Sequence, residues 1–278
     1  MGILKMKTPP LRRIAWASFI IIVLILSALV PRWHISGLLL AKGLASEAVV
    51  EKVIDGDTVI LFGGEKIRYL GINAPETMAW DGNQWITRPQ IFGEKAKKYN
   101  QKLVEGKKVS LVYDQRKRDA YHRLLAYVSV GDVFLNGELL RQGLALMDVR
   151  FPNLRYQNRL AAFEQEAKDH HRGLWGKLGG VAIPAQDAIN HLGEIGVVQG
   201  KITSVHLGKK KLYLNFGEKS EKVFTCLIWK ENLNNFPVKN RDLTKQYLGK
   251  KVRAYGFIKE IHGPVMIICT PNQIDIVN

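Results

Sequence analysis

From residue 47 onward, short apolar segments alternate with polar residues and are separated by glycine-containing turns. The first three segments are "EAVVEKVI", "TVILF" and "KIRYLGI", with an Asp-Gly turn and a Gly-Gly turn between them. Alternation with a period of two is typical of half-buried β-strands. The Gly-Gly pair at 63–64 suits a tight hairpin. This part of the chain is therefore predicted to fold as a mainly β structure.

Helical patterns are interleaved with the later strands. We expect helices over 92–105, closed by Gly106, over 136–144, capped by Asn136, and over 155–171. Two further strands are predicted at "KKVSLVY" and "RLLAYVSV". Five strands in about 80 residues, followed by helices, predict a five-stranded OB-type barrel carrying helices, which belongs to the α+β class.

The last hundred residues contain a second set of strand patterns. Five segments are apolar and strand-like, and residues 230–248 between the third and fourth are irregular. A second, smaller OB-like barrel is the simplest interpretation. The predicted organisation is an N-terminal segment 1–46, a first barrel 47–178, a linker 179–194 and a second barrel 195–278.

The chain is strongly basic, with a formal net charge of +16. Residues 47–178 carry 21 basic and 17 acidic side chains, and residues 179–278 carry 14 and 8. An excess of positive charge on both folded parts favours a polyanionic partner, either nucleic acid or anionic lipid. Ribosome-like surfaces or simple solubility would give the same balance.

The N-terminus predicts contact with a membrane. Residues 14–30 carry no charge, and four basic residues precede them, whereas only Arg32 follows closely. This distribution leaves the N-terminus cytoplasmic and the rest of the chain exported. The segment is expected to remain as an anchor, with the folded part extracytoplasmic. Cleavage of a signal peptide after Ala45, which would give a secreted protein, is the alternative.

The two cysteines, Cys226 and Cys269, do not have the spacing of a zinc site. Their pairing in a disulfide is left open, because it depends on their separation in space and on the redox compartment.

Basic and aromatic residues share one face of a strand in the second barrel. In "VRAYGFIK", Arg253, Tyr255, Phe257 and Lys259 alternate onto the same side. Such a face suits base stacking together with phosphate contact, so Arg253, Tyr255 and Phe257 are predicted to bind nucleic acid. In the alternative interpretation the two aromatic rings belong to the core and the basic residues lie at the edge of the barrel.

Charged residues with a common chemistry interrupt the first strands. Asp55 and Asp57 supply hard oxygen ligands of the kind that calcium prefers. Glu76 could orient or deprotonate a water molecule, and Arg68 and Arg123 match the oxygens of a phosphate. Acid, metal and guanidinium together are what hydrolysis of a phosphodiester needs.

The combination of these motifs resembles a known family. "VIDGDTVILFGGEKIRYLGINAPE", "FGEKAKKY", "DAYHRLLAYV", "NGELLRQGLA" and "RGLWG" occur in this order over residues 47–178. The arrangement is similar to that of the thermonuclease (staphylococcal nuclease-like) family. The resemblance implies an OB-type barrel with helices and calcium-dependent cleavage of DNA and RNA to 3′-phosphate ends.

The resemblance also implies a set of metal ligands. Asp57 would bind calcium directly, with Asp55 close behind it. Asn73 stands where the founding enzyme has a second ligating aspartate, so the loss of one negative charge predicts weaker calcium binding. Ala74 replaces a threonine that acts through its backbone carbonyl, which alanine keeps.

Catalytic roles follow from the same resemblance. Glu76 would orient or activate the attacking water, and Arg68 would contact the scissile phosphate. Arg123 would stabilise the transition state and the leaving oxygen, and Tyr121 would bind a neighbouring phosphate. Residues 149–151 replace a pair of base-binding tyrosines, which leaves the base preference open. Residues 78–90 are longer than the family pattern and are expected to form a loop beside the site.

Two functions that act on nucleic acid remain from the sequence, beside a third, a surface module that binds a protein partner through its C-terminal domain. One is a calcium-dependent nuclease held at the outer face of a membrane. The other is a catalytically weak or inactive protein that binds DNA or RNA through a degenerate barrel and a basic OB domain. Asp57, Arg68, Glu76 and Arg123 favour the nuclease, whereas Asn73 favours the binding protein.

Overall fold

The computed structural model describes residues 44–80, 83–87, 89–217, 223–236 and 240–277. Residues 46–278 form one compact unit. The predicted anchor at 14–30 lies outside the described residues. Within the described ranges, none of the helices has the length and apolar character needed to span a bilayer.

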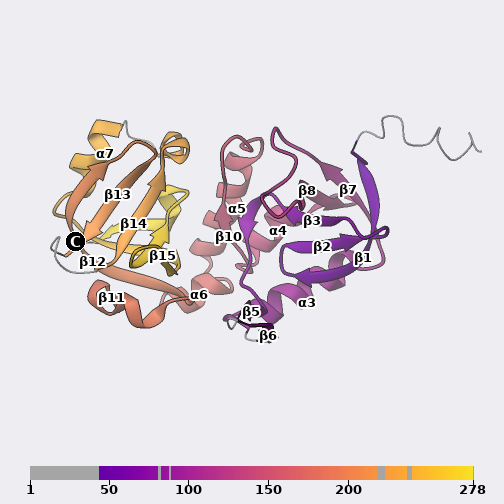
Figure 1. Cartoon of the computed structure of the whole chain (residues 1–278), viewed down its shortest axis with the longest axis horizontal. Helices are drawn as coiled ribbons and strands as arrows, with labels where there is room; N and C mark the ends of the chain where they lie inside the picture. Colours follow the sequence, from indigo (N-terminus) through magenta and orange to yellow (C-terminus); the bar gives the residue numbers. More distant parts are fainter. Residues whose placement is uncertain (1–43, 81–82, 88, 218–222, 237–239, 278) are drawn as a thin grey trace, which may run out of the picture. The chain divides into compact units, whose positions relative to one another are not determined.

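A closed barrel of five strands forms the first part of this unit (Figure 1). Its strands pair in the order β3-β2-β1-β7-β8, and a parallel pairing of β3 with β8 closes the ring. The bounds are β1 (Glu47–Asp55), β2 (Thr58–Leu61), β3 (Lys66–Tyr69), β7 (Lys108–Val112) and β8 (Leu124–Val130), and β9 (Val133–Phe134) extends the sheet beyond β8. The predicted five-stranded barrel is confirmed.

Helices cover the barrel where the sequence predicts them. They are α3 (Gly93–Val104), α4 (Leu135–Arg141) and α5 (Gln157–Asp169), and the short α6 (Leu174–Leu178) that follows them was not predicted. Asn136 is not the N-cap of α4, because the helix already begins at Leu135. Its side chain is instead buried, where it accepts a bond from Val128 N (2.8 Å) and donates one to Leu70 O (2.8 Å). The asparagine thus ties α4 to the barrel.

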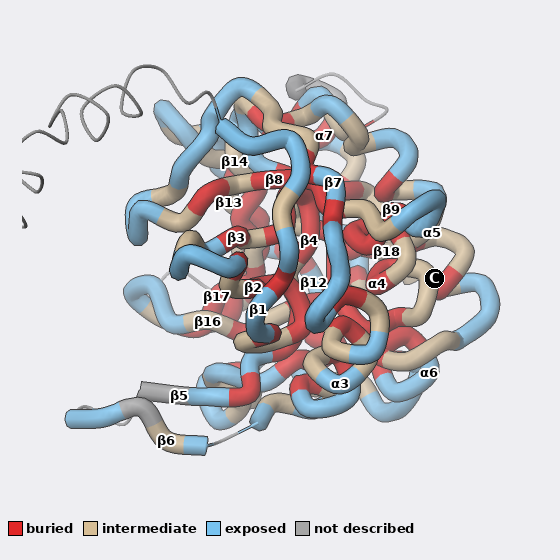
Figure 2. The backbone as a smooth tube through the Cα atoms, turned by 90° about the vertical axis from the view of Figure 1, so that its right-hand side faces the viewer, coloured by how far each residue is buried: buried red, intermediate tan, exposed pale blue. Residues whose placement is uncertain are grey.

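Two short pairs of strands lie beside the barrel. β4 (Gly71–Asn73) pairs antiparallel with β10 (Leu146–Asp148) and continues the chain toward Glu76. β5 (Met78–Trp80) and β6 (Trp85–Thr87) form a small hairpin, so the predicted loop 78–90 has a regular core. Figure 2 shows β5 and β6 at the lower edge of the molecule, away from the buried residues of the barrel.

The second barrel is built on one long strand. Its sheet has the order β16-β17-β14-β13-β12-β15-β18. β12 (Ile195–Leu207) pairs with β15 through its first half and with β13 through its second, with a register irregularity between Ile202 and Ser204. The other bounds are β13 (Lys211–Phe216), β14 (Thr225–Trp229), β15 (Lys251–Phe257), β16 (Lys259–Glu260), β17 (Pro264–Ile267) and β18 (Ile274–Val277). The predicted second OB-like barrel is confirmed.

Segments outside these strands pack on the second barrel. The predicted linker 179–194 contains β11 (Ile183–Pro184), parallel to β12, and the 3-10 helix η2 (Ala185–His191). Ala185 and Ala188 of η2 are buried in the barrel's own core. The irregular stretch 230–248 contains η3 (Lys230–Asn235) and α7 (Asn240–Tyr247), and η4 (Pro271–Gln273) precedes β18. The domain boundaries themselves stay a prediction.

The two barrels meet through an apolar cluster, which we call the junction. α5, α6 and β10 contribute one side and β12 and β15 the other. The buried members are Leu146, Ala167, Leu174, Trp175, Leu178, Ile195, Val197 and Tyr255. Lys168 closes the rim of the junction with an ion pair to Asp275 (2.9 Å) and a bond to Asn272 O (3.0 Å). Burial of this apolar surface joins the barrels into the single compact unit.

Candidate active site

The turn between β1 and β2 carries the two aspartates. Asp55 Oδ1 accepts a bond from the backbone N–H of Asp57 (3.0 Å), so Asp55 closes the turn. Burial raises the pKa of Asp55, and the positive charges of Arg68 and Arg123 oppose this effect. A Cβ at Gly56 would lie 2.6 Å from the Cβ of Ala74, so only glycine lets the turn sit this close to the chain after β4.

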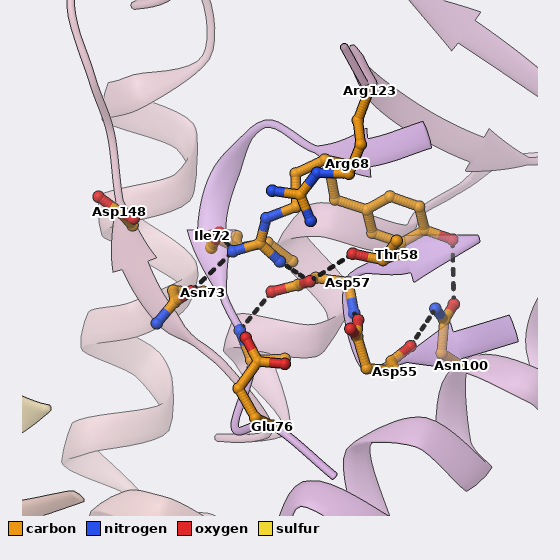
Figure 3. Close-up of polar contacts among 12 residues, drawn as sticks. Asp55, Asp57, Thr58, Arg68, Ile72, Asn73, Glu76, Asn100, Arg123 and Asp148 are labelled. Atoms are coloured by element: carbon orange, nitrogen blue, oxygen red, sulfur yellow. Dashed lines mark hydrogen bonds and ion pairs between the residues drawn. The ribbon is translucent and has the colours of Figure 1, made fainter. Parts of the chain in front are cut away.

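Asp57 points inward from this turn and is only 1% exposed. Its Oδ1 accepts a bond from Thr58 Oγ1 (3.2 Å) and forms an ion pair with Arg68 (Figure 3). Its Oδ2 accepts a bond from Ala74 N (2.5 Å). A buried carboxylate costs little free energy only when its oxygens are satisfied in this way.

Arg68, on β3, gathers the predicted metal ligands around its guanidinium. Besides the ion pair with Asp57, its Nη2 donates to Asn73 Oδ1 (2.7 Å) and to Ile72 O (3.3 Å). Burial lowers the pKa of Arg68, whereas the negative charges of Asp55 and Asp148 raise it. The arginine therefore holds β3, β4 and the aspartate turn together.

The fit of this group to calcium follows from its donors. Asp57 and Asn73 offer hard oxygens that converge on a positive charge, at present the guanidinium of Arg68. These oxygens suit a calcium ion, with water, backbone and substrate oxygens completing the shell. Ala74 meets Asp57 through its N–H, and a ligand role for its carbonyl stays a prediction. In the described ranges, no three His, Cys, Asp or Glu residues lie close enough to hold a metal by themselves.

Glu76 is exposed, but its backbone is fixed on both sides. Its N–H donates to Gln90 Oε1 (2.9 Å), and its carbonyl accepts a bond from Gln90 N (2.8 Å). A Cβ at Gly93 would lie 2.5 Å from that carbonyl, so glycine allows α3 to begin against Glu76. Partial desolvation and the charge of Asp55 raise the pKa of Glu76, while Arg68, Arg123 and Lys259 lower it.

Arg123 is held by a turn that Asp119 organises. Asp119 Oδ2 accepts a bond from Arg123 Nε (2.7 Å), and its Oδ1 accepts bonds from the backbone N–H groups of Tyr121 (2.9 Å) and Arg123 (3.0 Å). His122 has a φ of +62°, a left-handed conformation that favours glycine. Figure 3 shows Arg123 pointing from this turn toward Arg68. Two guanidinium groups thus face the aspartate turn.

Tyr121 lies on the surface next to Arg123. Its side chain is 80% exposed, and the guanidinium carbon of Arg123 lies 5.5 Å from the centre of its ring. Tyr121 therefore does not belong to the core, and its predicted contact with substrate remains a prediction.

The predicted nucleic-acid face of the second barrel has a different role. Tyr255 is 9% exposed and packs against Trp175, with ring centroids 5.6 Å apart. Arg253 donates to Gln199 Oε1 (2.7 Å) on the neighbouring strand β12. Because the face of β15 that carries Tyr255 packs against α5 and α6, this ring has no free side for a base. The prediction that Tyr255 stacks on nucleic acid is wrong, and the alternative that it belongs to the core is correct.

Three residues near the site were not predicted to belong to it. Gln90 fixes Glu76, and Asp148 lies beside the site on β10, paired with Arg150 through bonds of 2.9 and 2.6 Å. Burial raises the pKa of Asp148, but the bonds and charge of Arg150 hold it below its ordinary value. Lys259 comes from the second barrel. Only spatial contact between distant segments reveals these residues; the local sequence carries no signal for Gln90 or Asp148.

Comparisons with known proteins agree with this geometry. Residues 66–177 match a family model described as staphylococcal nuclease homologue. A thermonuclease of Staphylococcus hyicus is 33% identical over 129 residues, which are 45% of this chain and 73% of the relative. The endonuclease YncB of Bacillus subtilis is 38% identical over 135 residues, 47% of this chain and 62% of the relative.

The prophage-derived endonuclease YokF of Bacillus subtilis is 36% identical over 138 residues, 48% of this chain and 45% of the relative. All three matches cover less than half of the chain. The barrel and its helices α3, α4 and α5 lie where the sequence placed them, and Asp57, Arg68, Glu76 and Arg123 lie near one another in Figure 3. On this evidence the chain belongs to the staphylococcal nuclease homologue family.

Proposed function

We propose that this protein is a calcium-dependent nuclease that cleaves DNA, RNA or both to 3′-phosphate ends. Membership of the family makes the chain a nuclease, which is a phosphodiester hydrolase. The observation that carries the finer proposal is the placement of one exposed carboxylate, Glu76, beside two guanidinium groups and a buried aspartate.

The protein's own residues account for most of the chemistry. Glu76 receives or orients the proton of the attacking water. Burial and the charge of Asp55 raise its pKa, which makes the carboxylate a better proton acceptor. Arg68 and Arg123 compensate the negative charge that grows on the phosphate oxygens. Water attacks phosphorus, the bond to the 5′ oxygen breaks, and the phosphate stays on the 3′ side.

Asp57 and Asn73 would hold the metal, with Asp55 behind them. A bound calcium ion would polarise the phosphate and help to place the water. The guanidinium of Arg68, which contacts both of these side chains, would bind the scissile phosphate.

We also propose that the enzyme works outside the cytoplasm. This proposal rests on the uncharged segment 14–30 and the basic residues before it. A membrane anchor would tether the barrels to the outer face of the membrane, and signal cleavage would release them. Extracellular calcium is abundant enough to fill a site that Asn73 weakens.

A catalytically inactive binding protein is the second candidate. It is favoured by Asn73 in place of a carboxylate and by the contacts of Arg68 with both predicted ligands. Such a protein would bind nucleic acid in any metal and cut it in none.

The two candidates are separated by a cleavage assay on the purified full-length chain. Single-stranded DNA, duplex DNA and RNA are incubated with calcium, with magnesium and with chelator. Calcium-restored cleavage that Glu76→Gln and Arg123→Ala each reduce by about 100-fold or more supports the nuclease. Glu51→Gln and Arg116→Ala, which change exposed residues elsewhere, are the matched controls. Binding without cleavage in every metal would favour the second candidate.

A further inference from the structure

A chain of hydrogen bonds links Glu76 to the second barrel. Gln90 bonds to Glu76 through its backbone N–H and its Oε1, and its Nε2 donates to Gly193 O (2.6 Å). Gly193 N in turn donates to Ile258 O (2.8 Å), and Ile258 N donates to Glu194 O (2.9 Å). The residue after Ile258 is Lys259, so the backbone of Lys259 is coupled to the backbone of Glu76.

The same residues line one cleft. It has a volume of about 440 Å³, with Asn73, Glu76 and Gln90 on one side and Gly193, Phe257 and Lys259 on the other. The first three belong to the nuclease barrel and its hairpin segment, and the last two to the second barrel. The cleft beside Glu76 therefore has one wall that the family match, which ends at residue 177, does not include.

Lys259 is the basic group on that wall. In the described part of the chain, its ammonium forms no ion pair, although it lies close enough to lower the pKa of both Glu76 and Asp148. Its neighbour Glu260 is exposed and lines the same cleft. The ammonium of Lys259 lies near the carboxylate that is proposed to act on phosphodiesters. A phosphate of the nucleic acid suits it as a ligand, because lysine binds phosphate as a point charge.

We propose that Lys259 binds a phosphate of the nucleic-acid strand next to the scissile one, so that the second barrel forms part of the substrate site. Arg68 and Arg123 serve the scissile phosphate, and Lys259 lines the cleft beside Glu76. This inference rests on the proposed function, since it takes the cleft at Glu76 as the path of the strand. It gives the second barrel a role in positioning substrate through its edge strand β16, although Tyr255 is buried.

A binding experiment tests this role apart from catalysis. The full-length chain is titrated with a fluorescent single-stranded DNA oligonucleotide in chelator, at several salt concentrations. The variants are Lys259→Ala and Lys259→Arg. Lys251→Ala is the matched control, because Lys251 is an exposed lysine at the start of the preceding strand, β15, and does not line the cleft.

Loss of one phosphate contact has two signatures. Lys259→Ala should weaken binding about ten-fold, and the slope of log affinity against log salt should become shallower by about 0.7 for a single strand. Lys259→Arg should keep both values, because it keeps the positive charge. Lys251→Ala should change neither by a comparable amount. Circular dichroism of each variant checks that the fold is intact.

The result that overturns the proposal is a Lys259→Ala variant with the affinity and salt slope of the wild type, or with changes no larger than those of Lys251→Ala. A change in the pH profile of cleavage without a change in binding also overturns it, because Lys259 would then act only on Glu76. Wild-type cleavage in calcium is measured in parallel. If cleavage fails while the Lys259 effect on binding persists, the proposed reaction falls and the phosphate site stands.

Discussion

At the scale of single residues, Arg68 is the most informative side chain of the site. It pairs with Asp57 and bonds to Asn73, so one cation holds both predicted metal ligands. A second carboxylate at position 73 would attract both a metal ion and this arginine more strongly. The amide in this chain keeps the group together with one negative charge fewer, which is the physical reason to expect weak calcium binding.

Asn73→Asp should therefore strengthen calcium binding. The added negative charge is expected to lower the calcium concentration at half-maximal activity about ten-fold, because metal affinity rises with the charge of the ligands. The measurement is cleavage rate against free calcium. Asn158→Asp, on the exposed side of α5, is the control for a change of net charge. An unchanged half-maximal concentration would mean that residue 73 does not bind the metal.

At the scale of elements, α5 carries a buried carboxyl that joins three segments. Glu164 Oε1 accepts a bond from Met147 N (2.7 Å) of β10, and Oε2 one from Thr270 Oγ1 (3.4 Å) before η4. Burial raises the pKa of Glu164 to about 7. Because its pKa in the folded state lies above that in the unfolded chain, folding favours the protonated form.

This shift gives stability a dependence on pH. The protonated Glu164 contributes fully to stability below about pH 4, and this contribution is lost as pH rises through about 7. The loss lowers the free energy of unfolding by up to about 3 kcal/mol. Glu164→Gln cannot ionise, so its unfolding free energy should fall less than that of the wild type over this range. Urea unfolding at a series of pH values measures the difference. If the unfolding free energies of variant and wild type depend equally on pH, the raised pKa of Glu164 is contradicted. Glu94→Gln, which changes an exposed residue of α3, is the control.

Many of the helices and strands could be predicted from the sequence, because their residues follow the period of the element they form. Strands β3 and β7 of the first barrel alternate between buried and more exposed positions, and α3 and α5 begin and end within two residues of the expected bounds. β18, with only four residues, and the hairpin β5–β6 were not predicted. Segments this short carry too little periodic pattern, and tertiary pairing decides their conformation.

The same distinction holds in the site. Local sequence motifs contain Asp57, Arg68, Glu76 and Arg123, so these residues could be identified from the sequence alone. Gln90, Asp148 and Lys259 reach the site through contacts between distant segments, which no local pattern records. The error at Tyr255 has the same origin, because alternation along β15 defines a face without defining what covers it.

At the scale of the whole molecule, Gln90 couples the two barrels to the geometry of Glu76. Its bonds to Glu76 and to Gly193 place the carboxylate with respect to both walls of the cleft. Its role is one of positioning, since Gln90 holds the backbone of Glu76 rather than the phosphate.

Gln90→Ala should consequently reduce kcat by about ten-fold or more with little effect on KM, because small displacements of a catalytic group are costly. The steady-state constants and the melting temperature are measured together. Gln115→Ala, an exposed loop variant, is the control. An equal fall in melting temperature and activity, or a change confined to KM, would contradict a positioning role.

The junction has a consequence for how this protein can change over generations. Trp175 and Tyr255 bury one another across it, and Lys168 covers both rings, 5.5 and 4.7 Å from their centroids. A substitution on either side leaves its counterpart without its contact. Exchange of the second barrel by recombination would uncover the apolar side of α6. We therefore expect related chains that keep both barrels to show paired replacements at 175 and 255.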